Sequence, residues 1–253
     1  MVEVIEPDVY ASIPAASLAN IGSIYYATDR ECTYQCVKTA AGTYAWRNIT
    51  GRTTKRYTSA DLTGWTAVNG SGAATIDNGF KLALLTAQSS SAAYPDASSP
   101  RYYRDISSDI AGSDDFTIWV RIKAASGLDS DRLGGIALND TTEATGTGAC
   151  ALTGGALQLT AVPFLNGEYV GAPAAVTASD GTGWLGFSRR GGSWASLAGI
   201  GTTTEPPTNY ASCRIGVGGS TGQGKPTRLS LYAQKFGGTD MSVTFEDIVI
   251  YCY

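Results

Sequence analysis

The stretch Ser113-Asp-Asp-Phe-Thr-Ile-Trp-Val-Arg-Ile-Lys123 decides the fold class of this 253-residue chain. Its second part alternates between two sets of side chains. The apolar set is Phe116, Ile118, Val120 and Ile122, and the set between them is Thr117, Trp119, Arg121 and Lys123. Successive side chains of a β-strand point to opposite faces, so this period of two predicts a strand over residues 115–123 with one face toward a core.

Comparable short runs follow one another through the rest of the chain. Gly, Ser, Thr and Asp separate them, and these residues suit tight turns. No long window has apolar residues at the spacing of an amphipathic helix, and Gly alone contributes 31 residues. We therefore predict an all-β protein. The further predicted strands are residues 79–87, 133–139, 155–162, 184–189, 193–197, 213–217, 228–236 and 242–251.

About a dozen short strands without a repeat of fixed period are typical of two packed antiparallel sheets. Residues 113–123 are also similar to the central strand of concanavalin A-like jelly rolls, a family that includes laminin-G-like domains. Residues 240–251, where an acidic residue precedes an aliphatic run ending in Tyr, resemble their last strand. The resemblance covers residues 62–253 and implies a two-sheet jelly-roll sandwich with residues 64–70 paired to residues 242–251. A β-sandwich of another topology is the alternative.

A smaller β-rich part precedes the sandwich. Residues 22–49 contain three short runs, 23–27, 33–37 and 44–49, and form a β-meander too short to bury a core alone. The phrase Gly22-Ser-Ile-Tyr-Tyr-Ala-Thr-Asp29, followed by a Tyr strand and a Trp strand, resembles a module of tailed-phage virion proteins. Tail fibres, head fibres and capsid decoration proteins belong to this group, and the resemblance implies an N-terminal mounting segment.

Three parts follow from these observations. We predict an attachment and oligomerisation arm with the β-meander over residues 1–50, a polar linker over residues 51–61 and the jelly roll over residues 62–253. A short meander needs partner strands, and sites on a virus particle are symmetric, so we expect a homotrimer joined through residues 1–50. Contacts with other virion proteins are expected there too. The attachment and oligomerisation candidates are Ile24, Tyr25, Tyr26, Tyr34, Tyr44 and Trp46.

Charge and hydropathy exclude two classes of partner. The net charge of −4 lacks the positive excess of a nucleic-acid-binding surface. No run of 18 or more apolar residues is present, so we expect no membrane insertion. Residues 1–8 lack the basic and apolar regions of a secretory signal. We therefore expect assembly in a host cytoplasm and final localisation on a virion.

The residue inventory argues against an enzyme. The chain has no histidine, which removes Ser-His-Asp and Cys-His nucleophile arrangements. Jelly-roll glycosidases would use a run such as Glu-x-Asp-x-x-Glu on one strand face, and none occurs. The adjacent pairs Asp114-Asp115 and Glu246-Asp247 are expected to point to opposite faces of their strands. We predict no catalytic residue and no cofactor, although a carboxylate pair assembled from distant residues stays open.

No metal site is predicted. Cys32 and Cys36 are about 13 Å apart if both lie on one extended run, too far to share a metal ion. Calcium is the alternative, because clustered oxygen ligands suit it, although turn-forming residues explain the same sequence. The residues concerned are Asp129, Asp131, Asn139 and Asp140.

Glycan binding is the activity that the jelly-roll resemblance implies. Such domains stack aromatic rings on sugars and use polar side chains for the hydroxyl groups. The loop-borne candidates are Tyr169, Trp184 and Trp194, with Asn139, Asp140, Asn166 and Arg189 as polar partners. The competing explanation for each Trp is a core position, because aromatic residues on strands are usually buried.

Three hypotheses remain for the whole chain. The first is a structural protein of a bacteriophage particle, which serves either host-surface attachment or particle stabilisation. The second is a stand-alone carbohydrate-binding module, against which the missing secretion signal weighs. The third is a jelly-roll glycosidase, against which the missing carboxylate motif weighs.

Overall fold

The chain forms two compact units, Met1–Thr54 together with Tyr251–Tyr253, and Lys55–Ile250. Among the residues described, no helix has the length and apolarity needed to cross a membrane. The computed structural model describes residues 4–8, 12–27, 32–40, 42–48, 53–58, 64–70, 72–76, 79–84, 99–110, 115–126, 132–139, 146–153, 158–165, 168–169, 174–177, 182–190, 193–202, 204–216, 228–235, 237 and 240–253.

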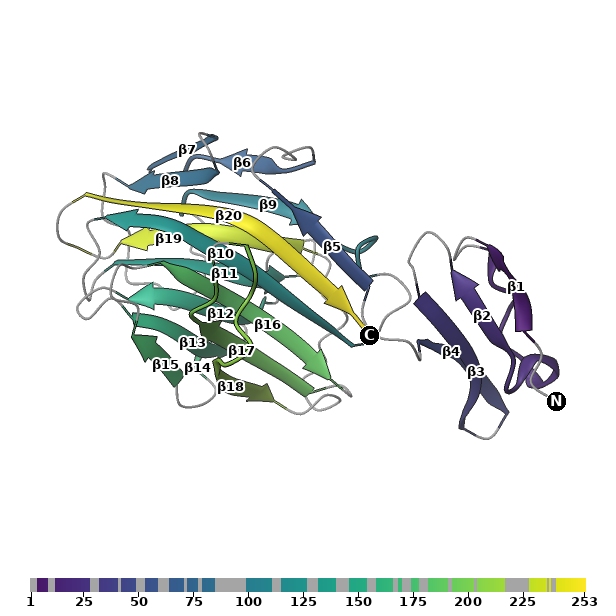
Figure 1. Cartoon of the computed structure of the whole chain (residues 1–253). Coiled ribbons are helices and arrows are strands. Elements are labelled where there is room, and N and C mark those ends of the chain that lie inside the picture. Colours follow the sequence, from purple (N-terminus) through teal and green to yellow (C-terminus); the bar gives the residue numbers. More distant parts are fainter. Residues whose placement is uncertain are drawn as a thin grey trace. The chain divides into compact units, whose positions relative to one another are not determined.

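The N-terminal unit is a four-stranded sheet in the order β1-β2-β3-β4. Its strands are β1 (Val4–Asp8), β2 (Ile24–Ala27), β3 (Cys32–Ala40) and β4 (Thr43–Asn48). The antiparallel strands β2, β3 and β4 correspond to the predicted meander. The sequence did not predict β1, which runs parallel to β2 (Figure 1). The short 3-10 helix η2 (Leu18–Asn20) lies between these two strands in the sequence.

Aromatic side chains make the small core of this unit. Tyr25 and Tyr34 are buried, and Ile13 and Trp46 pack against them. The rings of Tyr25 and Trp46 meet edge to face at 6.3 Å, and the Trp46 indole N–H donates to the Pro14 carbonyl oxygen over 2.7 Å. Three of the predicted attachment residues are therefore used at least partly within the unit, so Tyr25 and Tyr34 are not available to a partner.

The larger unit is a sandwich of two eight-stranded sheets, which confirms the all-β, two-sheet prediction (Figure 1). Sheet I has the order β18-β17-β16-β10-β20-β8-β7, with β5 paired to β20. Its strands are β5 (Thr53–Tyr57), β7 (Gly72–Ile76), β8 (Phe80–Leu84), β10 (Phe116–Ser126), β16 (Gly183–Arg190), β17 (Ser193–Gly199), β18 (Ala211–Gly216) and β20 (Met241–Cys252).

Sheet II has the order β14-β13-β12-β11-β19-β9-β6, with β15 paired to β13. Its strands are β6 (Thr66–Val68), β9 (Arg101–Asp105), β11 (Arg132–Asn139), β12 (Gly146–Thr153), β13 (Gln158–Leu165), β14 (Glu168–Tyr169), β15 (Ala174–Thr177) and β19 (Arg228–Lys235).

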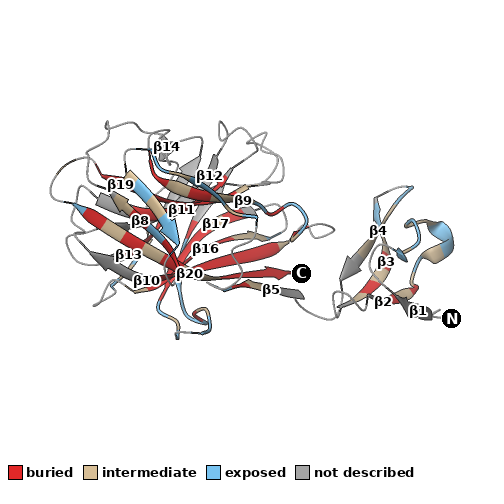
Figure 2. Cartoon of the chain, turned by 90° about the horizontal axis from the view of Figure 1, so that it is seen from above, coloured by how far each residue is buried: buried red, intermediate tan, exposed pale blue. Residues whose placement is uncertain are grey.

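The core lies between the two sheets, where buried residues line the facing strands (Figure 2). Gly134 of β11 marks a close approach, because a Cβ atom there would lie 2.9 Å from a Val243 methyl group of β20. Aromatic rings also cross the interface, with Phe80 of sheet I and Tyr102 of sheet II 5.2 Å apart. The predicted apolar set on β10 is buried as expected. Its members are Phe116, Ile118, Val120 and Ile122.

One prediction about strand pairing is wrong. Residues 66–68 pair with β9 in sheet II, not with β20. β8 takes that place instead, because Phe80 and Leu82 lie opposite the inward-facing Phe245 and Val243. The predicted linker also contains a strand, since Thr53–Tyr57 form β5 on the edge of β20.

Candidate ligand-binding faces

Two of the three predicted aromatic glycan ligands, Trp184 and Trp194, are buried. Trp184 and Trp194 lie in strands β16 and β17 and not in loops, and the Trp184 side chain is 0% exposed. Trp194 packs on Phe116 at 5.6 Å between ring centres, and the Arg189 guanidinium lies 5.9 Å from its ring. The prediction that these two rings stack on a sugar is therefore wrong for this conformation, since neither presents a free face.

The other predicted glycan ligands are placed only partly. Asn139 ends β11 and Tyr169 lies in β14, but their side chains are outside the described residues, as are Asp140 and Asn166 altogether. The calcium candidates Asp129 and Asp131 are outside them as well. Within the described part of the chain, no group of three His, Cys, Asp or Glu residues is arranged to hold a metal ion.

The strand register identifies which side chains form the outer face of sheet II. Ala233 of β19 lies opposite Gly134, which faces Val243 in the other sheet, so Ala233 points inward. Side chains alternate along a strand, and Ser230, Tyr232 and Gln234 therefore point away from sheet I. These residues were not among the site candidates predicted from the sequence. The signal that could have found them is the polar residue at every second position of Arg228–Lys235.

Two polar side chains on this outer face lack hydrogen-bond partners among the described residues. Gln234 is 0% exposed, and neither its amide nitrogen nor its amide oxygen has such a partner. The Ser230 hydroxyl is also fully buried and has none there. Buried polar groups in folded proteins are nearly always hydrogen-bonded, so each exception needs an explanation such as a water molecule or a ligand.

Small residues occupy two of the β11 positions beside this polar row, whereas Leu133 lies opposite Gln234. Ala137 and Gly135 of β11 lie directly opposite Ser230 and Tyr232. The next strand, β12, places Ala149 opposite Ala137, and Ala151 opposite Gly135. Gly135 and Ala137 are themselves buried, so these small residues lie under cover in the folded chain.

Charged and aromatic groups border the same face. Arg228 lies opposite both Asn139 and Asp105, so the predicted glycan ligand Asn139 shares this face by register. The Arg228 guanidinium lies 4.2 Å from the centre of the Tyr103 ring. Hydrogen bonds from Ser107 lower the pKa of Asp105, with the positive charge of Arg228 adding to the effect. This border therefore combines an ionised carboxylate, a cation and an aromatic ring.

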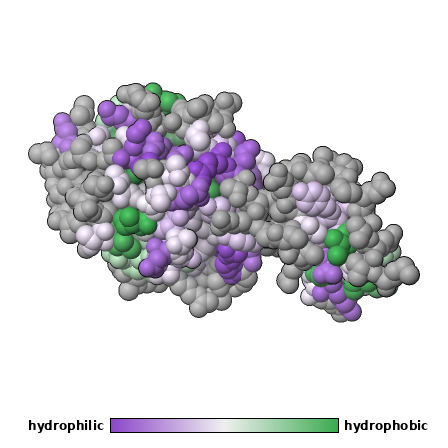
Figure 3. Space-filling model, viewed as in Figure 1, coloured by the Kyte–Doolittle hydropathy of each residue, from purple (hydrophilic) through white to green (hydrophobic). Residues whose placement is uncertain are grey.

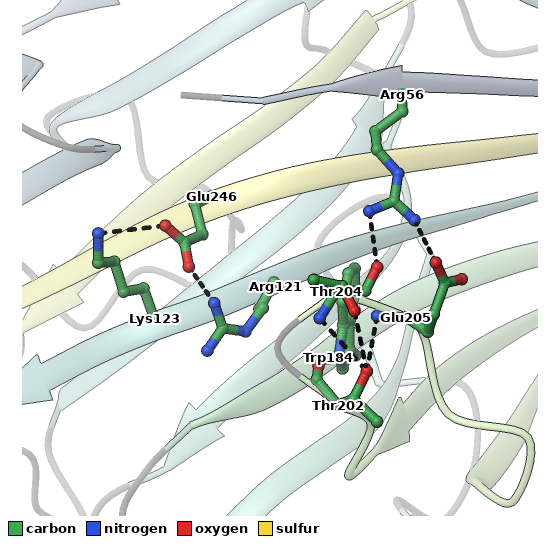
Figure 4. Close-up of polar contacts among 8 residues, drawn as sticks. All are labelled: Arg56, Arg121, Lys123, Trp184, Thr202, Thr204, Glu205 and Glu246. Atoms are coloured by element: carbon green, nitrogen blue, oxygen red, sulfur yellow. Dashed lines mark hydrogen bonds and ion pairs between the residues drawn. The ribbon is translucent and has the colours of Figure 1, made fainter. Parts of the chain in front are cut away.

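The outer face of sheet I carries a cluster of opposite charges. The Glu246 carboxylate of β20 accepts a hydrogen bond from the Arg121 guanidinium of β10 and lies 3.2 Å from the Lys123 ammonium (Figure 4). Arg121 and Glu246 are mostly buried, with 13% and 14% of their side chains exposed. Two cations thus compensate the charge of one mostly buried carboxylate.

The predicted orientation of the Glu246 and Asp247 side chains depends on an extended backbone. Burial along β20 alternates up to Glu246, but Glu246 and Asp247 are both half-buried, and the residues after them are buried without alternation. Asp247 has a φ of 45°. It is the only non-glycine residue with a positive φ in the described part of the chain. Strand alternation therefore does not decide where the Glu246 and Asp247 side chains point, because the positive φ departs from the extended backbone on which that expectation depends.

Charged side chains of both signs act on the Asp247 carboxyl group. Burial raises the pKa of Asp247, and the adjacent negative charge of Glu246 contributes. The positive charges of Arg56 and Arg121 act on it in the opposite direction. Arg121 belongs to the outer face of sheet I, and its charge acts on the Asp247 carboxyl group.

The N-terminal unit exposes apolar side chains. Leu18 and Ile21, at and just after η2, are 67% and 47% exposed, and Tyr26 of β2 is exposed as well. Figure 3 shows hydrophobic side chains on the surface of this unit. Large exposed apolar residues gathered on a small unit mark a surface suited to association.

Comparison with known proteins identifies the fold. No family model and no curated protein sequence matches the chain. Among solved structures, it is similar to an apo Crh5 transglycosylase, with 12% identity, a TM-score of 0.51, and coverage of 78% of this chain and 83% of that one. It is also similar to the CBM2 module of the evolved Dit protein of Lactobacillus casei BL23 phage J-1. That match has 15% identity, a TM-score of 0.51, and coverage of 80% and 95%. At these identities, the likeness shows the jelly-roll fold alone.

Proposed function

We propose that the larger unit is a glycan-binding jelly roll, and that the N-terminal unit carries it on a bacteriophage particle. The outer face of sheet II is the observation that carries this proposal. Ser230 and Gln234 hold polar atoms there without partners among the described residues. An amide offers two donors and acceptor lone pairs, which match the mixed donor and acceptor character of sugar hydroxyl groups. Since both side chains are fully buried, a ligand must displace what covers them.

The proposed activity is binding without cleavage of the sugar. On the outer face of sheet II, Asp105 supplies one carboxylate at the border, and the described positions Gly135, Ala137, Ser230, Tyr232 and Gln234 supply none. Glycoside hydrolysis needs two carboxyl groups placed across one glycosidic bond. We therefore propose, in line with the expectation from the sequence, that the chain is not an enzyme.

A jelly-roll glycosidase is the second candidate, and the Glu246–Asp247 pair favours it. Glu246 is paired with cations, whereas Asp247 has a raised pKa, and acid–base catalysis requires two carboxyl groups in such different settings. Against this, Glu246 is already engaged by Arg121 and Lys123. Release of reducing ends from an oligosaccharide, abolished by both Glu246→Gln and Asp247→Asn, would establish this candidate in place of binding alone.

The exposed apolar surface around η2 supports a carrier role for the N-terminal unit. A stand-alone carbohydrate-binding module has no need of Leu18 and Ile21 at its surface. We propose that this unit joins three copies of the chain and contacts capsid or tail proteins. The solved phage module of the same fold is consistent with a virion setting. Whether the displayed jelly roll attaches to a host or stabilises the particle depends on whether it binds a glycan.

Separate experiments test the parts of this proposal. A glycan array probed with the full chain tests binding, and electron cryo-microscopy of purified particles tests location. Light scattering of the wild type and of a Leu18→Asp, Ile21→Asp variant tests self-association, with Lys38→Asp in β3 as an exposed polar control. We expect a trimer for the wild type and the control and a monomer for the apolar variant. A monomeric wild type contradicts the trimer.

A further inference from the structure

We infer that residues 200–210 form a releasable strap over the Trp184 indole and that Arg56 is its latch. These residues connect β17 to β18 and, with the exception of residue 203, are described. Trp184 lies on the outer face of sheet I, because its register partner Arg121 alternates with the inward-facing Val120 and Ile122. An outward-facing Trp that is fully buried requires a cover, and the strap supplies it.

The strap contacts the sheet at a few specific points. The Trp184 indole N–H donates to the Thr202 carbonyl oxygen over 3.0 Å. The Pro207 ring packs closely on Gly199. A Cβ atom added at Gly199 would lie 2.7 Å from that ring. Tyr210 meets the ring of Trp119 edge to face at 5.4 Å. These contacts place the strap across the indoles of both tryptophans.

The strap is also closed on itself. The Thr202 hydroxyl accepts hydrogen bonds from the backbone N–H groups of Thr204, over 3.3 Å, and Glu205, over 2.9 Å. The Thr202 N–H donates in turn to the Glu205 carbonyl oxygen over 3.1 Å. Two consecutive prolines, Pro206 and Pro207, then fix the backbone that follows. A turn that satisfies its own hydrogen bonds keeps them when it leaves the sheet, so the strap can move as one piece.

Release exposes little apolar surface of the strap itself. Thr204, Glu205, Thr208 and Asn209 are already exposed in the closed position, and Pro207 is the buried residue among those described. Segments with few buried apolar contacts open locally at low free energy. The contacts that hold such a segment in place therefore decide how often it opens.

Arg56 provides the latch from a different part of the chain. Its guanidinium donates to the Thr204 carbonyl oxygen over 2.6 Å and to the Glu205 carboxylate over 3.1 Å (Figure 4). One planar cation thus binds two adjacent strap residues at once, which lysine cannot reproduce with the same geometry. Arg56 lies in β5, the first strand of the larger unit after the division at Thr54. The cover over Trp184 is thereby tied to the position of β5.

Hydrogen exchange of the full chain, followed by mass spectrometry, tests the latch. We expect Arg56→Gln to speed exchange in peptides that cover residues 200–210 by about ten-fold, because two charge-assisted hydrogen bonds are lost. Glu205→Gln weakens only the side-chain contact of Arg56 and should give a smaller increase. Lys55→Gln, on the same strand with its ammonium 5.5 Å from the Tyr57 ring, is the matched control and should leave the strap unchanged.

The same variants distinguish release from general loosening. Acrylamide quenching of tryptophan fluorescence should rise in Arg56→Gln, and Trp184→Phe in that background should remove most of the rise. Unchanged exchange over residues 200–210 in Arg56→Gln overturns the latch. An equal rise in every peptide of the larger unit overturns it too, because it reports a loss of global stability and no local release.

Discussion

Ala233 and Gln234 are adjacent in β19 and both fully buried, yet they point to opposite sides of sheet II. Ala233 faces the core through its register partner Gly134, whereas Gln234 faces away from sheet I with an amide that has no partner among the described residues. The inward position is filled by a residue that packing favours. The outward position holds a buried amide without a partner among the described residues, and such a group calls for a functional explanation.

Replacing this amide with an apolar group should stabilise the protein. An unsatisfied buried amide costs about 1–3 kcal/mol, so we expect Gln234→Leu to raise the free energy of unfolding by about 1 kcal/mol in urea titration. Leu is similar in volume and carries no polar atom. A loss of more than about 1 kcal/mol would show that the amide has partners in the folded protein and would remove the basis of the proposed site.

The contact between Gly134 and Val243 tests the register of the sandwich. A Cβ atom at position 134 would lie within 3.1 Å of three Val243 side-chain atoms. We expect Gly134→Ala to lower the free energy of unfolding by about 1–3 kcal/mol through overpacking. Adding Val243→Ala should recover part of this loss, and the double-mutant cycle measures the coupling. Additive losses would mean that the two residues do not face each other.

The two ion pairs on the outer face of sheet I should differ in strength. Glu246 is mostly buried with Arg121, whereas the Glu205 side chain that pairs with Arg56 is 64% exposed. We expect Glu246→Gln to cost about 2–3 kcal/mol of unfolding free energy, because it leaves the mostly buried Arg121 without this carboxylate. Glu205→Gln should cost under about 1 kcal/mol. Equal costs in denaturant titration would contradict the assigned burial.

Asp247 should make stability depend on pH with an identifiable sign. Burial raises its pKa in the folded state, so the contribution of this group to stability is present at low pH and is lost as pH rises through the folded pKa. Asp247→Asn cannot ionise and escapes that loss. We therefore expect the variant to gain on the wild type as pH rises from about 3 to about 7, measured by urea unfolding at each pH. A relative loss over that range would contradict the raised pKa.

Alternation along single strands predicted much of the fold. Residues 115–123 became β10 because a period of two is a local property that needs no knowledge of the partner strand. β12 was missed, since Gly146–Thr153 is rich in small residues and has little of the β-branched or aromatic character that marks strands. The register places this strand beside β11, on the side away from β19.

Contacts between residues far apart in the chain could not be predicted from the sequence. Arg56 holds the strap that buries Trp184. It lies 148 residues before its partner Thr204, so no local sequence pattern predicts this contact. Asp247 has a positive φ, which an Asp residue adopts only in a particular backbone setting. Both features concern the surroundings that a strand residue finally meets, and sandwich topology decides those.

Titration of the full chain with the oligosaccharide class found on the glycan array tests the central claim most directly. We expect the wild type to bind saturably and Gln234→Leu to bind at least about ten-fold more weakly, because a site built to hydrogen-bond a hydroxyl loses that contact. Ser230→Ala should weaken binding in the same direction, whereas Thr244→Val on the outer face of sheet I should bind as the wild type does. Absence of binding by the wild type to any glycan, or equal affinity of the wild type and Gln234→Leu, would contradict a glycan site on sheet II.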